Sequence, residues 1–464
     1  MPSRSLLCLL VFVASLCVVP GVSATQLPVC IVGAGPGGLT IAHELEAKGI
    51  STVTFDKQPA VGGKCQSYYD GPGQSVYHPL GALIFTNQTW ANALPIILAS
   101  GLPLSEGPTS QFLEHGFYYG AGSAASTVGP APALTADQQA AIGQELQKYA
   151  QYWQGTFAPT YLVPRYTNGV PADLAVPMAQ WLQTQGYQAL PAIMQLGAAP
   201  YGYGDIAQTP ALYMLTYFTP EILSAFLGVV PSYNVDFHKV MVFYSSTIKG
   251  PIHVNAPVTK IDRTGSNPVV TYTQGSKSAT QSCRDVVLAF PPTLDNLNAL
   301  NMPLSAGEKD VFGKTVITPY WSSAVTTKID FPAVYLQTPF EPLGAPVGFQ
   351  RTSSISPVAT AWSWGAFGNT LSLDDVTHLL ASTLTSVQTG AGIAYPTVSA
   401  SDVKAIRKLD YFPRFNSSDL AGGVYGRYNA LQGQKHTYYS SGLNEFELVE
   451  YTMRAGKELV ATFF

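Results

Sequence analysis

A glycine-rich turn follows a short apolar run near the start of the chain. The stretch from Pro28 to Leu39 reads P-V-C-I-V-G-A-G-P-G-G-L and has the spacing G-x-G-x-x-G at Gly33, Gly35 and Gly38. In such a turn the first glycine permits a tight bend, the second lets a pyrophosphate approach the backbone, and the third lets the following helix pack on the strand. These residues therefore predict the binding of a dinucleotide.

The elements around this turn must position it. Thr40 to Lys48 predicts an amphipathic helix that stops at Gly49, and Ile50 to Phe55 alternates as a second strand would. Asp56 follows that strand, at about the ~20 residues downstream where an acid meets the ribose hydroxyls. This order predicts a βαβ unit of a Rossmann-like α/β domain.

The residues after the proposed ribose acid distinguish between possible cofactors. Gly62, Gly63 and Lys64 lie in the segment V-G-G-K-C-Q-S. It resembles the G-G-R-x-x-S/T segment of the flavoprotein group that contains amine oxidases and phytoene desaturases, with lysine in place of the usual arginine. The resemblance implies FAD rather than a nicotinamide cofactor, with Lys64 near its phosphates. A lysine offsets phosphate charge but lacks the two-pronged contact of arginine.

Two later segments resemble the same flavoprotein group. Ile252 to Arg263 is similar to its second FAD-binding stretch, which implies that the backbone of Val258 meets the adenine. Tyr438 to Tyr451 resembles its closing flavin motif. That resemblance implies that Gly442 forms a turn and that a helix starting near Glu445 lies against the cofactor.

Intervening motifs narrow the resemblance. The segments His78 to Phe85, Tyr201 to Gly204, Pro210 to Tyr217 and Tyr411 to Phe415 are similar to the β-cyclopiazonate dehydrogenase family. Members of that family are FAD enzymes of secondary metabolism. The resemblance implies oxidation of an apolar natural product, in some members with ring closure. Hydride would pass to N5 of the flavin, and molecular oxygen would reoxidise it.

The order of the segments predicts two interleaved domains. Residues 25–85, 247–297 and 406–464 are expected to form a glutathione-reductase-like FAD-binding domain, and residues 86–246 and 298–405 an α+β substrate domain. The first insert has mainly helical periodicity, whereas Val316 to Ile329 in the second predicts a strand that faces the flavin.

Aromatic residues are frequent in both inserts. Tyr203, Tyr320, Trp321 and Tyr411 lie in the inserts or in motifs similar to the family. We expect these four to wall an apolar pocket over the flavin, although most aromatic residues serve only packing. Lys314 precedes the predicted flavin-facing strand, and the resemblance to amine oxidases, which often keep a lysine near N5, makes it a further candidate.

No residue pattern identifies a general base. His78, Lys314 and His436 are candidates, although each more often has a structural role. Two other reactions stay open: double-bond isomerisation of a polyunsaturated lipid, and amine oxidation. A binding protein that keeps the fold without turnover is a further alternative. The seven histidines show no metal-ligand spacing, so no metal site is predicted.

The first residues predict a removable signal peptide, residues 1–24. Arg4 precedes the apolar run from Leu6 to Val19, and V-S-A precedes Thr25. An uncleaved anchor is the alternative, but the run is short for the ~20 residues that a membrane span needs. The sequence thus predicts entry into the secretory pathway, an extracellular location and no membrane span after cleavage.

Three cysteines remain after the signal peptide: Cys30, Cys65 and Cys283. Their odd number and wide spacing argue against a disulfide framework, so Cys30 is expected to be a small core residue and Cys65 to pack beside the glycine pair. Asn87 and Asn416 begin N-x-S/T sequons, which predict surface positions and support secretion.

Composition favours a small-molecule partner. Charged residues make up 11% of the chain, against about 25% in a typical domain. The formal net charge is −4 and no basic stripe is present, which argues against a nucleic-acid partner. The predicted partners are an apolar small molecule and molecular oxygen.

Overall fold

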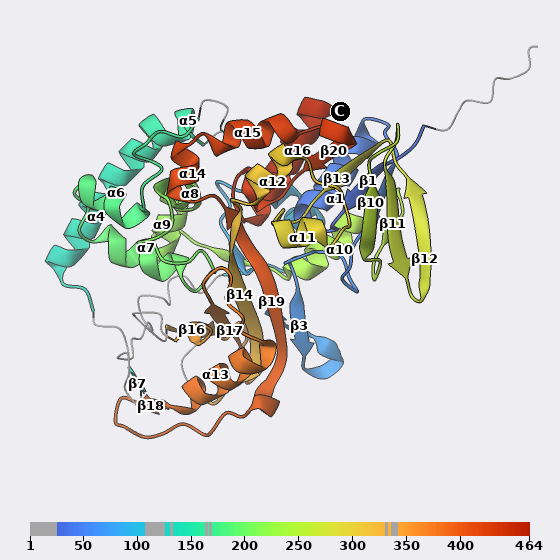
Figure 1. Cartoon of the computed structure of the whole chain (residues 1–464). Coiled ribbons are helices and arrows are strands. Elements are labelled where there is room, and N and C mark those ends of the chain that lie inside the picture. The colour runs from blue at the N-terminus through green and yellow to red at the C-terminus, as the bar shows by residue number, and fades with distance from the viewer. Residues whose placement is uncertain are drawn as a thin grey trace, which may run out of the picture.

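The computed structural model describes residues 26–106, 126–129, 133–162, 166, 169–329, 333–335 and 342–464 (Figure 1). The predicted signal peptide lies outside these residues.

A five-stranded parallel sheet forms the dinucleotide-binding half of the molecule. The strand that leads into the glycine turn lies at its centre, and all its residues are buried, as expected of a parallel strand covered on both faces. The strands come from the three segments expected for the FAD-binding domain. Across the sheet they are β20 (Thr437–Tyr439), β13 (Asp285–Leu288), β1 (Val29–Val32), β2 (Thr52–Phe55) and β9 (Ile252–His253).

Two helices from opposite ends of the chain pack against each other beside this sheet. They are α1 (Pro36–Ala47) and α16 (Val449–Phe463). α1 begins earlier than predicted because Pro36 suits a first helical turn, where no N–H partner is required. The two backbones approach closely, since a Cβ on Gly456 would lie 3.0 Å from the carbonyl oxygen of Gly37.

A three-stranded antiparallel sheet flanks the parallel one, at the right in Figure 1. It contains β10 (Val258–Asp262), β11 (Val269–Gln274) and β12 (Lys277–Ser282). The chain passes from β12 directly into β13. At its other end, Val258 is the first residue of β10 and follows shortly after β9 of the parallel sheet.

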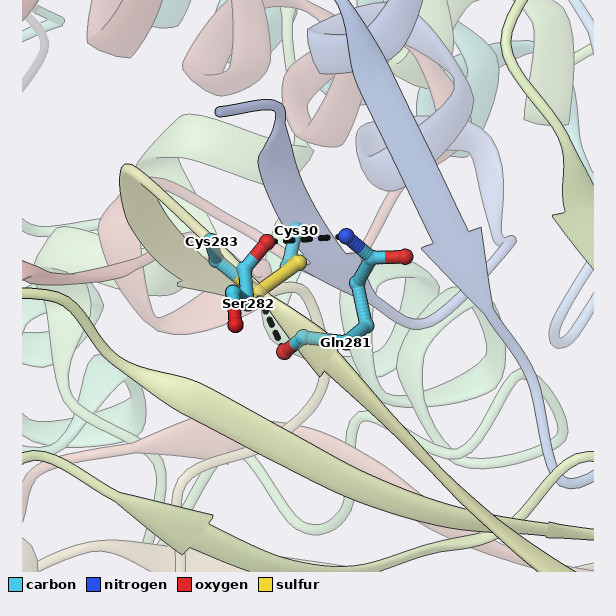
Figure 2. Close-up of a disulfide and its surroundings, with 4 residues drawn as sticks. All are labelled: Cys30, Gln281, Ser282 and Cys283. Carbon is cyan, nitrogen blue, oxygen red and sulfur yellow. Dashed lines mark hydrogen bonds between the residues drawn. A yellow bond between two sulfur atoms is a disulfide. The ribbon is translucent and has the colours of Figure 1, made fainter. Parts of the chain in front are cut away.

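A disulfide joins Cys30 in β1 to Cys283, the residue that follows β12 (Figure 2). Their Cα atoms are 5.7 Å apart and both residues are fully buried. The expectation of unpaired cysteines is wrong. The residues are 253 positions apart in sequence, but β1 and β13 are neighbours in the parallel sheet, with Val29 opposite Asp285. Cys65 is free and buried.

The second half is built on an antiparallel sheet of order β15-β16-β17-β14-β19. Two long strands dominate it, and α13 (Leu373–Thr385) packs against it (Figure 1). The domain boundary expected at residue 406 falls inside β19, which pairs with β14 along most of its length. The strands are β14 (Val316–Thr326), β15 (Ala333–Tyr335), β16 (Pro346–Gln350), β17 (Val358–Trp364) and β19 (Val403–Arg414).

The remaining elements are mostly helices and short strands. The first insert is mainly helical, as its periodicity predicts; its helices from α4 to α9 gather at the left in Figure 1, whereas α10 lies near the parallel sheet. The helices are α2 (Leu94–Ala99), α4 (Ala136–Tyr152), α6 (Met178–Thr184), α7 (Leu190–Ala198), α8 (Ala211–Tyr217), α9 (Pro220–Phe226) and α10 (Phe237–Ser246), and the strands are β3 (Ser67–Asp70), β4 (Val76–Pro79), β5 (Ile84–Phe85), β6 (Ser105–Glu106) and β8 (Tyr233–Asn234).

Two sequence predictions concern the exposure of the sequons and the presence of a membrane-spanning helix. Asn87 and Asn416 are both exposed, as predicted for their sequons. Within the described residues, no helix combines the length and the apolar character needed to cross a membrane.

Candidate active site

One cavity of about 750 Å³ extends from the glycine turn to the aromatic residues of the second sheet. The parallel sheet, the helical insert and the strands β14, β17 and β19 all contribute to its walls. Segments distant in sequence therefore meet around a single space.

The three glycines of the first turn have different surroundings. Gly33 has φ 115°, and a Cβ there would lie 2.5 Å from the carbonyl oxygen of Ala289. A Cβ on Gly38 would lie 1.9 Å from the carbonyl oxygen of Gly33. Gly35 has room, since the nearest atom to its Cβ position is Gly63 Cα at 3.6 Å. Gly33 and Gly38 are thus required by packing, whereas Gly35 leaves bare backbone facing the cavity.

The N-terminus of α1 and the end of β2 meet at this part of the cavity. Gly35 and Gly37 line it, and the free N–H groups and dipole of a helix N-terminus favour an anion there. Asp56 also lines it, and its carboxylate accepts hydrogen bonds from the N–H groups of Ala34 and Gln58, both at 2.7 Å. Burial raises the pKa of Asp56, and these two hydrogen bonds oppose the rise.

The second glycine turn packs on the first. Gly63 and Lys64 line the cavity, whereas Gly62 supports the turn by donating its N–H to the carbonyl oxygen of Ala34 at 2.8 Å. Val258 lines the cavity as well. It lies close to Asp56 in the fold because the N–H of Ala256 donates to the carbonyl oxygen of Asp56 at 2.8 Å.

These features fit a dinucleotide cofactor. A bare-backbone cradle, a helix N-terminus and an oriented carboxylate follow one another along the wall. They are suited to a pyrophosphate and the ribose next to it. Within the described residues, no group of three His, Cys, Asp or Glu side chains could hold a metal ion.

The closing segment lies partly where it was expected. Gly442 lines the cavity. Glu445 does not: it is buried and accepts a hydrogen bond from Arg454 Nε at 2.6 Å. Burial raises the pKa of Glu445 to about 7, although Arg454 opposes the rise. The helix begins at Val449 rather than near Glu445, since residues 442–444 form a separate 3₁₀ turn.

Glu447 is a cavity residue that the sequence did not single out. Its carboxylate forms an ion pair with Lys64, with Nζ and Oε2 3.0 Å apart. Lys64, which was expected near the phosphates, is thus partnered by a carboxylate in this structure. Glu447 lies inside the segment from Tyr438 to Tyr451, but nothing in the spacing separates it from the neighbouring acids.

Three of the four aromatic candidates line the cavity together. The ring centroids of Tyr320 and Tyr411 are 5.0 Å apart, and those of Tyr203 and Tyr411 are 5.6 Å apart. Trp321 is not among the lining residues. Successive residues of a strand point to opposite faces, so Trp321 is buried on the other side of β14, under the ammonium group of Lys408.

The phenol groups of this wall are held by hydrogen bonds. Tyr320 donates to the carbonyl oxygen of Pro200 at 2.6 Å, and Tyr203 to that of Glu447 at 3.0 Å. Tyr411 donates to the hydroxyl oxygen of Tyr203 at 3.3 Å. Burial raises the pKa of all three tyrosines well above the ordinary value. The wall is therefore neutral and positioned, rather than a source of a proton acceptor.

Gly202 is a second residue that the sequence did not single out. It has φ 81°, and a Cβ there would lie 2.8 Å from ring atoms of both Tyr320 and Tyr411. Any side chain would push the rings apart. The signal was available, because Gly202 is the first glycine of the Y-G-Y-G segment.

The three candidate general bases do not line the cavity. Each pairs instead with an acidic residue elsewhere. Lys314 follows α12 (Ala306–Phe312) and bonds to a residue one turn back on that helix, which explains why it does not extend along β14. The pairs are Lys314 with Asp310, His78 with Asp70, and His436 with Asp285.

Comparison with known proteins agrees with this fold. A family model described as an NAD(P)-binding Rossmann-like domain matches residues 31–94. The FAD-dependent oxidoreductase oblC of Cochliobolus heterostrophus is 27% identical over 437 residues, covering 89% of this chain and 86% of that protein. The fold of a CLA-producing fatty acid isomerase from P. acnes is similar with a TM-score of 0.79 and 20% identity, covering 94% of this chain and 99% of that one. A putrescine oxidase bound to putrescine has a TM-score of 0.64 and 15% identity, covering 94% and 98%.

Fold and site together define the class of this protein. It is a mixed α/β protein with a Rossmann-like dinucleotide-binding domain and an interleaved second domain. Its fold is similar to those of a fatty acid isomerase and of a putrescine oxidase.

Proposed function

We propose that this protein is an FAD-dependent oxidoreductase that dehydrogenates an apolar small molecule of secondary metabolism, with molecular oxygen as the final electron acceptor. Oxidative ring closure belongs to the same proposal, since the family that the sequence resembles includes such reactions. Support comes from the site, from the motifs and from the relative named FAD-dependent oxidoreductase, which is similar over 89% of this chain.

The cofactor is FAD. The relative named FAD-dependent oxidoreductase supports this cofactor, and the Rossmann-like match covers both glycine turns. Residues of the later segments, Val258 and Gly442, line the same cavity as Gly35 and Gly63. When bound, FAD supplies a hydride acceptor at N5 of its flavin ring and passes the electrons on to oxygen.

The observation that carries the proposal is the continuity of the cavity. The cradle at Gly35 and the aromatic wall at Tyr203, Tyr320 and Tyr411 belong to one space. A dinucleotide held at one end can therefore reach a substrate held at the other. Apolar rings with fixed phenols exclude water and orient a nonpolar molecule.

The contributions of this chain are binding and orientation. The N–H groups at the start of α1 would hold the pyrophosphate, and Asp56 would accept hydrogen bonds from the ribose. Tyr203 and Tyr411 fix each other through their hydroxyl groups, and Tyr320 is fixed to the backbone. The aromatic wall thus presents a substrate carbon in one orientation.

A visible spectrum of the purified protein tests the proposal. Flavin bands near the usual ~370 and ~450 nm should appear, and acid precipitation should release a noncovalently bound cofactor. Anaerobic addition of indole alkaloids, polyamines and polyunsaturated lipids would identify the substrate class by bleaching. A colourless protein from cells supplied with flavin would contradict the proposal.

Double-bond isomerisation of a polyunsaturated lipid is a second candidate reaction. In this reaction hydride is removed from one carbon and returned to another, so no external oxidant is consumed. The absence of His78, Lys314 and His436 from the cavity wall favours it, because the reaction places less demand on a strong base. Peroxide production during turnover would support the oxidase reaction, and a shifted double bond without oxygen uptake would support the isomerase.

We also propose that the chain enters the secretory pathway and acts outside the cell. The disulfide between Cys30 and Cys283 supports this, since such bonds persist mainly in oxidising compartments. The exposed sequon residues Asn87 and Asn416 are accessible to glycosylation. Intact-mass analysis of protein from the medium would test it: a chain that still carries residues 1–24, or no chain in the medium, would contradict the proposal.

A further inference from the structure

We propose that Lys64 occupies a cation-binding position in the cavity wall with its own ammonium group, so that the cavity accepts substrates that are uncharged at this point. The inference rests on the proposed function, because it concerns the substrate of the same cavity. It makes Lys64 and Glu447 specificity-determining residues.

The surroundings of Lys64 are those that recognise an ammonium ion. Its Nζ lies 3.0 Å from Glu447 Oε2 and 5.5 Å from the centroid of the Tyr411 ring. A carboxylate beside an aromatic face is a common arrangement for binding a cation. Here the cation is part of the protein, and both charged side chains are largely buried, with 23% and 12% exposure.

The position of this pair is fixed by a closed series of contacts. Glu447 binds Lys64 through its carboxylate and accepts the hydroxyl of Tyr203 at its backbone carbonyl oxygen. Tyr203 accepts the hydroxyl of Tyr411, and the Tyr411 ring faces Lys64. A Cβ on Gly442 would lie 2.8 Å from Glu447 Oε2, so the carboxylate is also packed from behind. The pair therefore has little freedom to separate.

Other ionisable groups do not offset the pair. The buried tyrosines nearby stay protonated, and burial raises the pKa of the Cys65 thiol to about 12. Asp410 lies further along β19, where Asn296 donates to it at 2.9 Å, and Lys408 lies over the ring of Trp321. Asp56 and Lys57 line the dinucleotide end.

The consequence for a ligand follows from these charges. An ammonium group entering here would be repelled by Lys64, and a carboxylate would be repelled by Glu447. Neither could replace the internal partner without leaving a buried charge unpaired, which is costly. A neutral molecule leaves the pair intact.

Reciprocal neutral variants test the inference on the flavin-loaded protein. Lys64→Met removes the internal cation at similar length, and Glu447→Gln removes the anion. Binding of benzylamine and of benzoate would be measured by isothermal titration calorimetry, and the flavin spectrum of each variant would report cofactor loading separately. Lys408→Met is the control for loss of a lysine on a strand that borders the cavity, since the Lys408 ammonium lies over the ring of Trp321 and pairs with neither Glu447 nor Tyr411.

The expected result is a reciprocal gain. Lys64→Met should bind benzylamine at least about tenfold more tightly than the unchanged protein, and Glu447→Gln should do the same for benzoate, since a charge-assisted hydrogen bond commonly exceeds a tenfold effect. The double variant and Lys408→Met should show neither gain.

Several results would overturn the inference. Tight benzylamine binding by the unchanged protein would do so, as would loaded single variants with no gain for either ligand. If one variant fails to load FAD, the other decides. Loss of FAD from both would also contradict it, because the pair would then serve the cofactor. A colourless unchanged protein would instead contradict the proposed function.

Discussion

Single atoms distinguish the three glycines of the first turn. At Gly33 and Gly38 a Cβ would collide with carbonyl oxygens, whereas at Gly35 the protein itself leaves room. A substitution at Gly35 should therefore affect the ligand, and a substitution at Gly38 should affect the fold. The same sequence motif thus contains residues of two kinds.

Gly35→Val should give a folded protein without flavin, because the added methyl groups occupy the place where a pyrophosphate meets the backbone. Gly38→Ala should lower the stability of the apoprotein itself, since its Cβ position is 1.9 Å from Gly33 O. Visible absorbance and the thermal midpoint of the apoprotein measure the two effects. If the Gly35→Val protein kept its full flavin absorbance, the phosphates would have to bind elsewhere.

Some site residues can be recognised from their spacing in the sequence, whereas others reach the site only through the tertiary fold. Gly33, Gly35 and Asp56 were recognisable because they are local in sequence. Glu447 was not, because its partner Lys64 lies at the other end of the chain. Trp321 was assigned to the wrong face because the strand pattern shows alternation but not which face meets the cavity.

At the scale of elements, a buried ion pair and the hydrogen bond next to it connect three elements that are distant in sequence: β10, α12 and β20. Arg263, directly after β10, contacts both carboxylate oxygens of Glu308 in α12, at 2.7 and 3.1 Å. Tyr439 of β20 donates to the same carboxylate at 2.5 Å. Burial alone would raise the pKa of Glu308, but these hydrogen bonds outweigh it and lower the pKa to about 2. The carboxylate is therefore held in its charged form.

This pair predicts a defined pH dependence. A lowered pKa in the folded state stabilises the protein above the unfolded value, about 4.5, and the contribution is lost as the pH falls toward about 2. Glu308→Gln should reduce the free energy of unfolding by about 3 kcal/mol at pH 7, and by progressively less below about pH 4.5.

Urea unfolding at several pH values measures this difference. Asp262→Asn is a suitable control, because hydrogen bonds also lower the pKa of this neighbouring carboxyl to about 2, yet the group is exposed to solvent. The control should leave stability nearly unchanged. A Glu308→Gln effect that is equal at pH 7 and pH 3 would show that packing rather than charge is responsible.

At the scale of the whole molecule, the disulfide between Cys30 and Cys283 constrains the chain most widely. It closes a loop that contains the whole helical insert. Closing so long a loop limits the unfolded state, so the bond should contribute about 3 to 5 kcal/mol. The double variant Cys30→Ala with Cys283→Ala should unfold at correspondingly lower urea concentration.

Dithiothreitol provides the control for this experiment. It should lower the unfolding midpoint of the unchanged protein and have no further effect on the double variant. An unchanged midpoint in the double variant would show that the bond adds nothing to the packing of β1 against β13.

The overall architecture was predictable to a useful extent, and the exceptions have physical causes. The strands of the parallel sheet follow from local patterns and from the order of the motifs. The disulfide could not be predicted in this way, because the pairing of β1 with β13 is a property of the tertiary fold. The end of β19 could not be predicted either, since this strand of the second sheet continues through the motif around Tyr411.

The order of strands in the parallel sheet also determines when the site can exist during synthesis. β1 and β2 are made first, but β20 and α16, which complete the sheet and the cavity, are made last. At the ~5 to 20 residues per second of translation, the nascent glycine turn waits roughly 20 to 80 s for these partners. We therefore expect cofactor loading to be a late event, and a chain truncated before α16 should not retain flavin.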